Sequence, residues 1–368
     1  MKTPPKVKGH FLLGSLLDVK RSILDFLLKS ARTYGDIFQC TATMLEDWTA
    51  RNAKDTPINI AAEMMGLTTQ IMAAVIFGKD EVKDTSRFID NLTVLEEMII
   101  HREFGIGRFF TWAPTPGNTK FNRAIQCLRE ETAKNVQRYK GGDKGKCLLS
   151  MLADPQNKKV LTDRELSDQA LTFIQAGHET TATSLNWLFY FLARNPGVES
   201  KLRAELDEVL NGAAIQAEDL DRLTYLEMAV NETLRILPSA GLTGRQALQD
   251  DEIDGFAISE KSFVMMSPYV MQRTAAYWEN PTAFEPERFT PDKIRKRHPY
   301  SYFPFLRGPH QCIGQDFALM EIRLIAATIL QKYQLKLVSD EELRPTTIPI
   351  LKIPNNCMLM NLNAISPF

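Results

Sequence analysis

The residue best suited to chemistry is Cys312, which lies in the segment FLRGPHQCIG at 305–314. A helical pattern over 315–333 begins directly after this segment. Unsatisfied N–H groups and the positive dipole at a helix N-terminus favour a thiolate, so the position suits a nucleophile or a soft metal ligand. Gly308 and Gly314 allow tight turns around the sulfur. The alternative for an isolated cysteine is a small buried hydrophobe, and the flanking pattern favours the chemical role.

A second candidate lies midway along an expected long helix, in AGHETT at 176–181. A glycine inside a helix costs about 1 kcal/mol relative to alanine, so Gly177 needs a compensating reason. The Thr180 hydroxyl can bond to the Ala176 carbonyl, which would leave a groove for a diatomic ligand or a water. Glu179 adds a carboxylate, and the two groups together could relay protons. The alternative is close helix packing at Gly177 beside an incidental Glu179.

A third feature is the pair Glu232 and Arg235, whose spacing puts both side chains on one helix face. Arg288, in the turn-rich FEPERF at 284–289, supplies a second arginine that could join them. Such pairs are frequent in helical proteins and mostly solvated, so the pair alone indicates no function.

The elements that must position these residues are mainly helical, with a small β portion. The clearest helix opens with TDRE at 162–165, which fits a capping box, and its pattern runs to Ala193. Other helices are expected at 17–34, 58–77, 121–139, 198–210, 219–222 and 226–237, and strands at 252–258, 262–265 and 335–338. Turn clusters are expected at 113–118 and 141–146.

Composition excludes several classes of protein. The 368 residues are 44% hydrophobic and 24% charged, as in ordinary globular proteins, and the net charge of −1 offers no field for nucleic acid or an anionic membrane. Five scattered cysteines without a CxxC pair argue against a disulfide framework or a zinc site. The longest apolar run found, 185–193, is far short of the roughly eighteen residues that a spanning helix needs. With no recognisable signal peptide, we expect a cytoplasmic protein without a transmembrane segment.

Taken in this order and spacing, the motifs resemble those of the cytochromes P450, the haem-thiolate monooxygenases. The family's cysteine-loop pattern is matched by Phe305, Gly308, His310, Cys312 and Gly314. Its central-helix motif is matched by Ala176, Gly177, Glu179, Thr180 and Thr181. Glu232 and Arg235 match its Glu-x-x-Arg pair, and Arg288 its Pro-Glu-Arg-Phe segment. The similarity runs from about residue 58 to the C-terminus, and the opening residues resemble soluble bacterial members.

The resemblance implies a bound haem b. Cys312 would be the axial thiolate ligand of its iron, in a loop that includes Phe305 and Gly314. His310 and Arg245 match positions that usually contact the haem propionates.

The resemblance also implies catalytic and structural roles. Thr180 and Glu179 would deliver protons to dioxygen, while Ala176 and Gly177 leave room for it. Glu232, Arg235 and Arg288 would form a buried triad that braces the cysteine loop.

Two departures from the family pattern stand out. Leu306 and Arg307 occupy positions where the family often has further glycines. More seriously, a block of several tens of residues, containing the first strands and the helices after them, is missing near residues 39–43. The chain 1–368 is therefore expected to be one P450-like domain with an incomplete N-terminal sheet. Trp48 and Arg51 do not fit the family's Trp-x-x-x-Arg motif, and we interpret them as ordinary helix packing.

Two functions from different classes remain open. The first is a monooxygenase that hydroxylates an apolar small molecule with O2 and electrons from a separate ferredoxin or flavoprotein; a peroxide-using version is a variant of it. The second is a non-catalytic remnant that binds haem weakly or not at all and acts as a helical scaffold or interaction protein. The missing block favours the remnant, whereas retention of every motif set, including Thr180, favours the enzyme. The basic run KIRKRH at 293–298 is either a surface for an acidic partner or a solvated loop.

Overall fold

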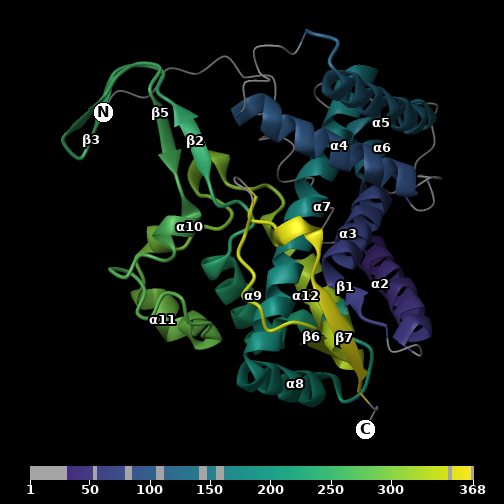
Figure 1. The fold of residues 1–368 in the computed structure, drawn as a ribbon, viewed down its shortest axis with the longest axis vertical. Coiled ribbons are helices and arrows are strands. Elements are labelled where there is room, and N and C mark those ends of the chain that lie inside the picture. Colours follow the sequence, from purple (N-terminus) through teal and green to yellow (C-terminus); the bar gives the residue numbers. More distant parts are fainter. Residues whose placement is uncertain are drawn as a thin grey trace. The chain divides into compact units, whose positions relative to one another are not determined.

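The computed structural model describes residues 31–52, 56–78, 85–104, 112–140, 147–154, 161–346 and 350–365, and most of them are helical (Figure 1). The α-helices are α2 (Ala31–Asn52), α3 (Ile60–Phe77), α4 (Thr85–Phe104), α5 (Pro116–Lys140), α6 (Leu148–Leu152), α7 (Asp163–Arg194), α8 (Pro196–Leu210), α9 (Thr224–Ile236), α10 (Pro268–Met271), α11 (Pro291–Lys296) and α12 (Gln315–Lys332). Short 3₁₀ helices are η2 (Ala217–Asp221), η3 (Pro286–Phe289), η4 (Pro299–Ser301), η5 (Gly308–His310) and η6 (Pro354–Asn356). The expected fold class, mainly α with a small β portion, is confirmed.

The strands are short and pair only in antiparallel fashion within the described residues. They are β1 (Ile58–Asn59), β2 (Thr243–Gln246), β3 (Asp251–Ile253), β4 (Phe256–Ile258), β5 (Phe263–Met266), β6 (Tyr333–Leu337) and β7 (Leu359–Ala364). One sheet has the order β1-β7-β6, while β2 pairs with β5 and β3 pairs with β4. The β2–β5 ribbon and its β3–β4 tip extend away from the neighbouring helices (Figure 1).

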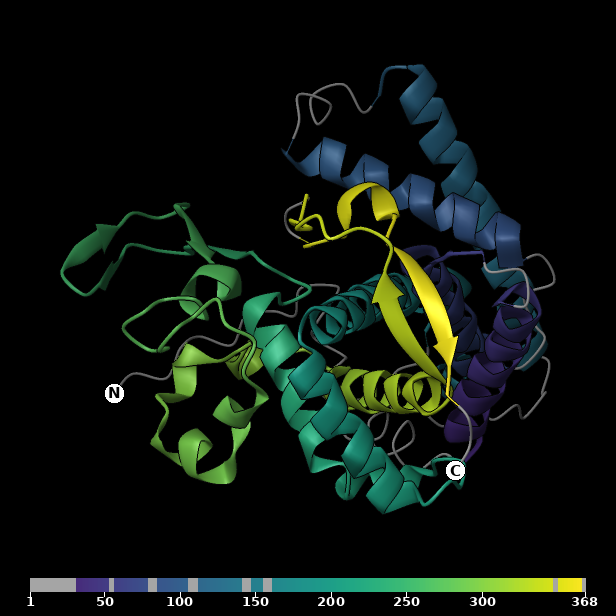
Figure 2. The same ribbon diagram turned by 60° about the horizontal axis from the view of Figure 1, so that its bottom comes forward.

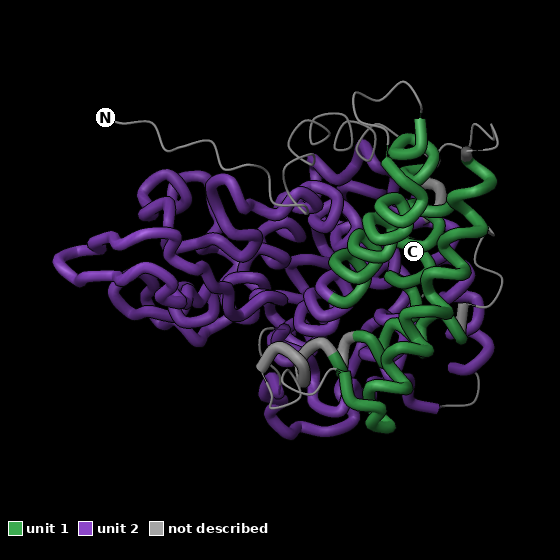
Figure 3. Tube along the Cα trace, turned by 90° about the horizontal axis from the view of Figure 1, so that it is seen from above, with its two compact units in different colours: residues 1–36, 66–179 green, residues 37–65, 180–368 purple. Residues whose placement is uncertain are grey.

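The chain divides into two compact units (Figure 3). The first comprises residues 1–36 and 66–179, and the second comprises residues 37–65 and 180–368. The first unit contains α4, α5, α6, most of α3 and the first half of α7. The second contains most of α2, β1, the rest of α3 and α7, and all later elements, including the cysteine loop. A single domain over 1–368 stays a prediction.

Helix α7 spans 32 residues and begins as its sequence predicts. The backbone N–H of Thr162 donates to Glu165 Oε2 at 2.8 Å, and the N–H of Glu165 donates to Thr162 Oγ1 at 3.2 Å. These reciprocal bonds are the capping box, and they satisfy N–H groups that a helix end otherwise leaves without partners.

The core of the second unit lies around α12. The sequence 315–332 is rich in Leu, Ile and Ala, and α12 contacts α8, α9 and β6. Figure 2 shows the β6–β7 pair beside it. Trp187 on α7 is fully buried, and its Nε1 donates to the carbonyl of Leu351 at 2.6 Å, which ties α7 to the C-terminal segment.

The sequence was misleading over 252–258, where a single strand was expected. The structure has a hairpin, because Asp254 and Gly255 turn the chain between β3 and β4 with φ angles of +50° and +82°. Two consecutive residues with left-handed φ angles form a tight turn whose twist matches that of the two flanking strands. The sequence Asp-Gly favours this turn. The Asp-Gly pair was therefore the turn signal.

Several boundaries also differ from expectation. Residues 116–118 belong to α5 rather than to a turn, because Thr115 Oγ1 accepts from the N–H of Asn118 at 3.1 Å and Pro116 occupies the first helical position. The expected helix at 219–222 is the 3₁₀ helix η2. The later helices and strands otherwise agree to within about two residues. The expected loop 141–146 and residues 17–30 of the first expected helix lie outside the described residues.

Helix α2 runs without interruption across residues 39–43, where the family resemblance places a missing block. In the described part of the chain before residue 240, β1 is the only strand, in keeping with the expected incomplete sheet. Trp48 is fully buried and donates to Glu63 Oε2 at 2.9 Å, and Arg51 pairs with Glu63 Oε1 at 2.8 Å. The interpretation of these two residues as helix packing is confirmed.

Helix α3 corrects the estimate of the longest apolar run. By length and composition it is the one helix in the described residues that could cross a membrane, with a mean hydropathy of 1.6 over 18 residues. Two-thirds of it is buried inside the protein (67%), and core helices pass the same test. This is weak evidence for a membrane span.

Candidate functional site

The cysteine loop folds back on itself before α12 begins. The N–H of Cys312 donates to the carbonyl of Phe305 at 2.8 Å, and the N–H of Leu306 donates to the carbonyl of Phe303 at 3.0 Å. Leu306 and Gly308 have φ angles of +60° and +75°. Gly308 adopts this conformation without cost, whereas a residue with a Cβ pays roughly 1–2 kcal/mol for it. Leu306 therefore carries strain at a position where the sequence had already departed from the family's glycine.

Cys312 is exposed, and α12 begins three residues later, at Gln315. Gly314, the residue immediately before that helix, has no side chain and makes no capping hydrogen bond. A negative charge near such a helix end is stabilised by the dipole. A role for Cys312 as a thiolate ligand stays a prediction.

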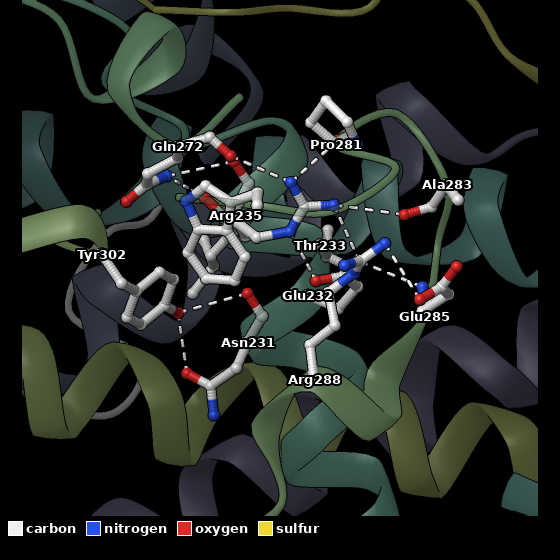
Figure 4. A network of polar contacts seen from close by, with 12 residues as sticks. Asn231, Glu232, Thr233, Arg235, Gln272, Pro281, Ala283, Glu285, Arg288 and Tyr302 are labelled. Carbon is white, nitrogen blue, oxygen red and sulfur yellow. Dashed lines mark hydrogen bonds and ion pairs between the residues drawn. The ribbon is translucent and has the colours of Figure 1, made fainter. Parts of the chain in front are cut away.

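Glu232, Arg235 and Arg288 come together in the structure (Figure 4). Arg235 binds both carboxylate oxygens of Glu232, with Nε to Oε2 at 2.7 Å and Nη2 to Oε1 at 2.8 Å. Arg288 Nε lies 3.3 Å from Glu232 Oε1, and its Nη2 lies 2.9 Å from Glu285 Oε2. Glu232 and Arg235 are fully buried. The predicted buried triad therefore exists as a geometric unit.

The remaining donors of Arg235 bind backbone carbonyls. They donate to Gln272 at 2.9 Å, to Pro281 at 2.8 Å and to Ala283 at 3.1 Å. Burial raises the pKa of Glu232, and the bonds from Arg235 oppose that shift. A buried ion pair is favourable only when its remaining hydrogen-bonding groups are satisfied. Here the remaining N–H groups of Arg235 are satisfied by backbone carbonyls, and these bonds join α9 to the segment 272–283.

Aromatic side chains surround this cluster. The guanidinium of Arg235 lies 4.9 Å from the Trp278 ring centroid, and that of Arg297 lies 4.3 Å from it. Arg297 also stacks on Phe289, and burial lowers its pKa. Arg297 belongs to the basic run 293–298, so one cation of that run is committed to packing, while Lys293, Arg295 and Lys296 are exposed.

On α7, the carbonyl of Thr180 lies within reach of two hydroxyl groups. Ser184 Oγ donates to it at 2.9 Å and Ser239 Oγ at 2.8 Å, and the two hydroxyl oxygens are 2.7 Å apart. This contact connects α7 to the chain after α9. The predicted bond from the Thr180 hydroxyl to Ala176 stays a prediction.

The surroundings of Gly177 in the first half of α7 distinguish between a groove for a small ligand and close helix packing. A Cβ on Gly177 would lie 2.6 Å from both Cε and Sδ of Met72 on α3. The glycine thus permits close packing of α7 on α3, which supports the alternative that the sequence had left open. Ala176 is exposed, whereas Glu179 is buried with 2% exposure and is not a surface residue.

The two residues expected near the propionates have different surroundings. Arg245 on β2 is half-buried, and its Nη1 donates to the carbonyl of Gly244 at 2.7 Å and to Thr243 Oγ1 at 3.2 Å. His310 on η5 is exposed. Their role at a cofactor stays a prediction.

The sequence motifs do not include three polar residues of the second unit, of which Gln272 and Glu321 are fully buried and Tyr302 is half-buried. Gln272 is fully buried beside Arg235, and the Tyr302 hydroxyl donates to Asn231 Oδ1 at 2.8 Å. Glu321 on α12 is fully buried, and neither of its carboxyl oxygens has a hydrogen bond of ordinary geometry. Burial raises the pKa of Glu321 to about 8, moderated by the Thr181 hydroxyl. The sequence does indicate Glu321, because its carboxyl group interrupts the apolar pattern of the helix over 315–332.

Comparisons with known proteins identify relatives. The family model described as Cytochrome P450 matches residues 22–360. The chain is 32% identical to cyclooctatin synthase of Streptomyces melanosporofaciens over 83% of this chain and 69% of that protein. It is 31% identical to cyclooctat-9-en-7-ol 5-monooxygenase of the same organism over 89% of this chain and 74% of that protein.

Solved structures share the fold. The crystal structure of the cytochrome P450DA heme domain matches with a TM-score of 0.81 and 24% identity, covering 96% of this chain and 76% of that chain. The chain spans less of other relatives, such as 41% of cytochrome P450 4V2 of Rattus norvegicus, to which it is 37% identical over 58% of its own length.

Proposed function

The chain belongs to the cytochrome P450 family, and we propose that it is a haem-dependent monooxygenase that hydroxylates an apolar small molecule with O2. Electrons would come from a separate ferredoxin or flavoprotein, and the protein would act in the cytoplasm. A relative named as a 5-monooxygenase, matched over 89% of this chain, supports the class of reaction.

The residues present fit a haem. Cys312 offers a soft, exposed sulfur beside the N-terminus of α12, where a thiolate is favoured. A Cβ added to Gly314 would lie 4.0 Å from that sulfur and, apart from Gly314 and its two chain neighbours, would have no other heavy atom within 4 Å. Arg245 and His310 offer a cation and a donor for carboxylates. Cys312 would hold the iron, and these two residues the propionates.

Bound haem would supply activation of O2 and transfer of an oxygen atom to a carbon of the substrate. The protein's own residues would control protons and position. The Thr180 hydroxyl and the buried Glu179 carboxylate would hold and pass protons. The bonds from Ser184 and Ser239 to the Thr180 carbonyl would keep that part of α7 in place.

One observation carries this proposal: Cys312 combines exposure, a returning loop with positive φ angles and an adjacent helix N-terminus, in a chain of this family. The test is the absorbance spectrum of the reduced, carbonyl-bound protein. Wild type is expected to show the red-shifted Soret band of a thiolate ligand, and Cys312→Ala should abolish it. Wild type without that band would refute the proposal. Turnover driven by hydrogen peroxide alone would point to the peroxide-using variant.

A specific observation also favours the second function, a non-catalytic remnant that acts as a helical scaffold. Helix α2 is continuous where the family's block is expected, and Phe263 and Met265 on β5 are 66% and 63% exposed. Exposed apolar side chains of this size are typical of interaction surfaces. Stoichiometric haem in the purified protein would exclude the remnant, and its absence would favour it.

A further inference from the structure

Gln272 lies beside Arg235 (Figure 4), and its side-chain amide connects two segments of the chain. Its Nε2 donates to the carbonyls of Leu234 at 2.9 Å and Arg235 at 3.1 Å, and its Oε1 accepts from the N–H of Phe303 at 2.8 Å. Its own carbonyl accepts from Arg235 Nη1 at 2.9 Å. Gln272 and Arg235 therefore bind each other reciprocally, each side chain to the other's backbone.

These bonds satisfy groups that would otherwise be costly. Leu234 and Arg235 lie in the last turn of α9, where carbonyls have no partner within the helix. Gln272 is fully buried, so water does not replace its bonds, and a buried polar group without a partner destabilises the fold. Glutamine suits this position because its side-chain amide can donate two hydrogen bonds and accept one at the same time.

The hydrogen bonds continue from Phe303 to the cysteine loop. The carbonyl of Phe303 accepts from the N–H of Leu306 at 3.0 Å, and the carbonyl of Phe305 accepts from the N–H of Cys312 at 2.8 Å. The residue before Phe303, Tyr302, is anchored to Asn231 on α9. The start of the loop is thus held to α9 twice, directly through Tyr302 and indirectly through Gln272, which binds Phe303.

We propose that Gln272 is a positioning residue that fixes the cysteine loop against α9, so that the position of the buried Arg235 determines that of Cys312. The effect of Gln272 on a bound haem rests on the proposed function. The linkage between Gln272 and the loop is a property of the polypeptide alone.

Hydrogen exchange of the full chain without haem tests the linkage. Gln272→Met keeps the length of the side chain and removes all three bonds. The matched control is Gln334→Met on β6, which removes a bond of Gln334 Nε2 to Glu199 Oε2 at 3.1 Å. We expect the amides of Phe303, Leu306 and Cys312 to exchange at least about tenfold faster in Gln272→Met only, the factor for one lost buried hydrogen bond.

Equal acceleration in both variants, or none at these three amides, would overturn the proposal. If Gln272→Met does not fold, Gln272→Glu decides, because a carboxylate still accepts from Phe303 but donates to neither carbonyl. We then expect the Phe303 amide to keep most of its protection. Its full loss in that variant would contradict the assigned bond.

A spectroscopic measurement separates positioning from general stability. In haem-loaded protein, Gln272→Met should convert part of the reduced carbonyl Soret band from the thiolate to the thiol position, and Gln334→Met should not. An unchanged band in Gln272→Met would overturn the role towards Cys312. If wild type lacks the band, the proposed function fails, and the exchange experiment still decides the linkage.

Discussion

Gly177 of α7 packs so closely on Met72 of α3 that a Cβ would lie 2.6 Å from the methionine sulfur. The shortest ordinary contacts of a Cβ are well above this distance, so any side chain here must displace Met72. Because these atoms are the end of a flexible side chain, Met72 can shift, and we expect overpacking in Gly177→Ala to cancel most of the roughly 1 kcal/mol that the gain in helix propensity would add to the free energy of unfolding. Urea denaturation measures it.

The control is Gly66→Ala in α3, where no atom lies within 4 Å of the new Cβ. This change should stabilise the protein by up to about 1 kcal/mol through propensity alone. In a Met72→Ala background, Gly177→Ala should also become stabilising. A Gly177→Ala effect that is independent of residue 72 would contradict the packing explanation.

Removal of the buried carboxylate of Glu232 should be among the most damaging changes in the second unit. Glu232→Gln leaves the fully buried Arg235 without its counter-charge, which costs about 3–5 kcal/mol. Glu227→Gln is the matched control on the same helix, because its pair with Arg323 spans 3.6 Å and Glu227 is 55% exposed. We expect a loss below about 1 kcal/mol there. Similar losses in the two variants would show that the triad contributes no special stability.

The buried Glu321 predicts a pH dependence of stability. Its carboxyl has a pKa of about 8 in the folded protein against an ordinary value of 4.5, so between these values the unfolded chain releases a proton that the folded chain retains. The stabilising contribution is therefore complete below about pH 4.5 and is lost as the pH rises towards 8, by at most about 1.4 kcal/mol per pH unit. Glu321→Gln cannot ionise and should flatten the fall of the thermal midpoint over this window.

The comparison for Glu321 is the exposed Glu341→Gln, which should leave the pH profile as in wild type. No charged group contributes to the shift of Glu321; on the helices packed against α12, Glu199 binds Arg203 and Glu232 binds Arg235. A wild-type slope that persists in Glu321→Gln would assign the pH dependence to another group.

The cysteine loop depends on a left-handed backbone at Gly308. Gly308→Ala should cost about 1–2 kcal/mol from the backbone alone, because no atom lies within 4 Å of its Cβ. Gly255→Ala in the β3–β4 turn has the same conformation and the same open space, so it should cost as much. Only Gly308→Ala should change the reaction rate of the Cys312 thiol with a disulfide reagent. Identical rates in the two variants would mean that the loop conformation does not depend on Gly308.

Local patterns in the sequence determined much of the structure. The capping box at 162–165, the apolar period of 315–332 and the spacing of Glu232 and Arg235 act between neighbouring residues, so the elements formed where their own residues specified. The Asp254-Gly255 turn also belonged to this class, although the strand prediction overlooked it.

Only the tertiary structure decided which long-range partners these elements meet. That Met72 lies against Gly177, that Gln272 links Arg235 to Phe303 and that Glu321 lies without a hydrogen bond of ordinary geometry are results of packing between distant segments. Buried polar groups must find partners among whatever the folded chain brings near them, and a one-dimensional pattern does not contain that information. The sequence thus specified a cysteine directly before a helix, and the folded chain determined which segments hold the loop that carries it.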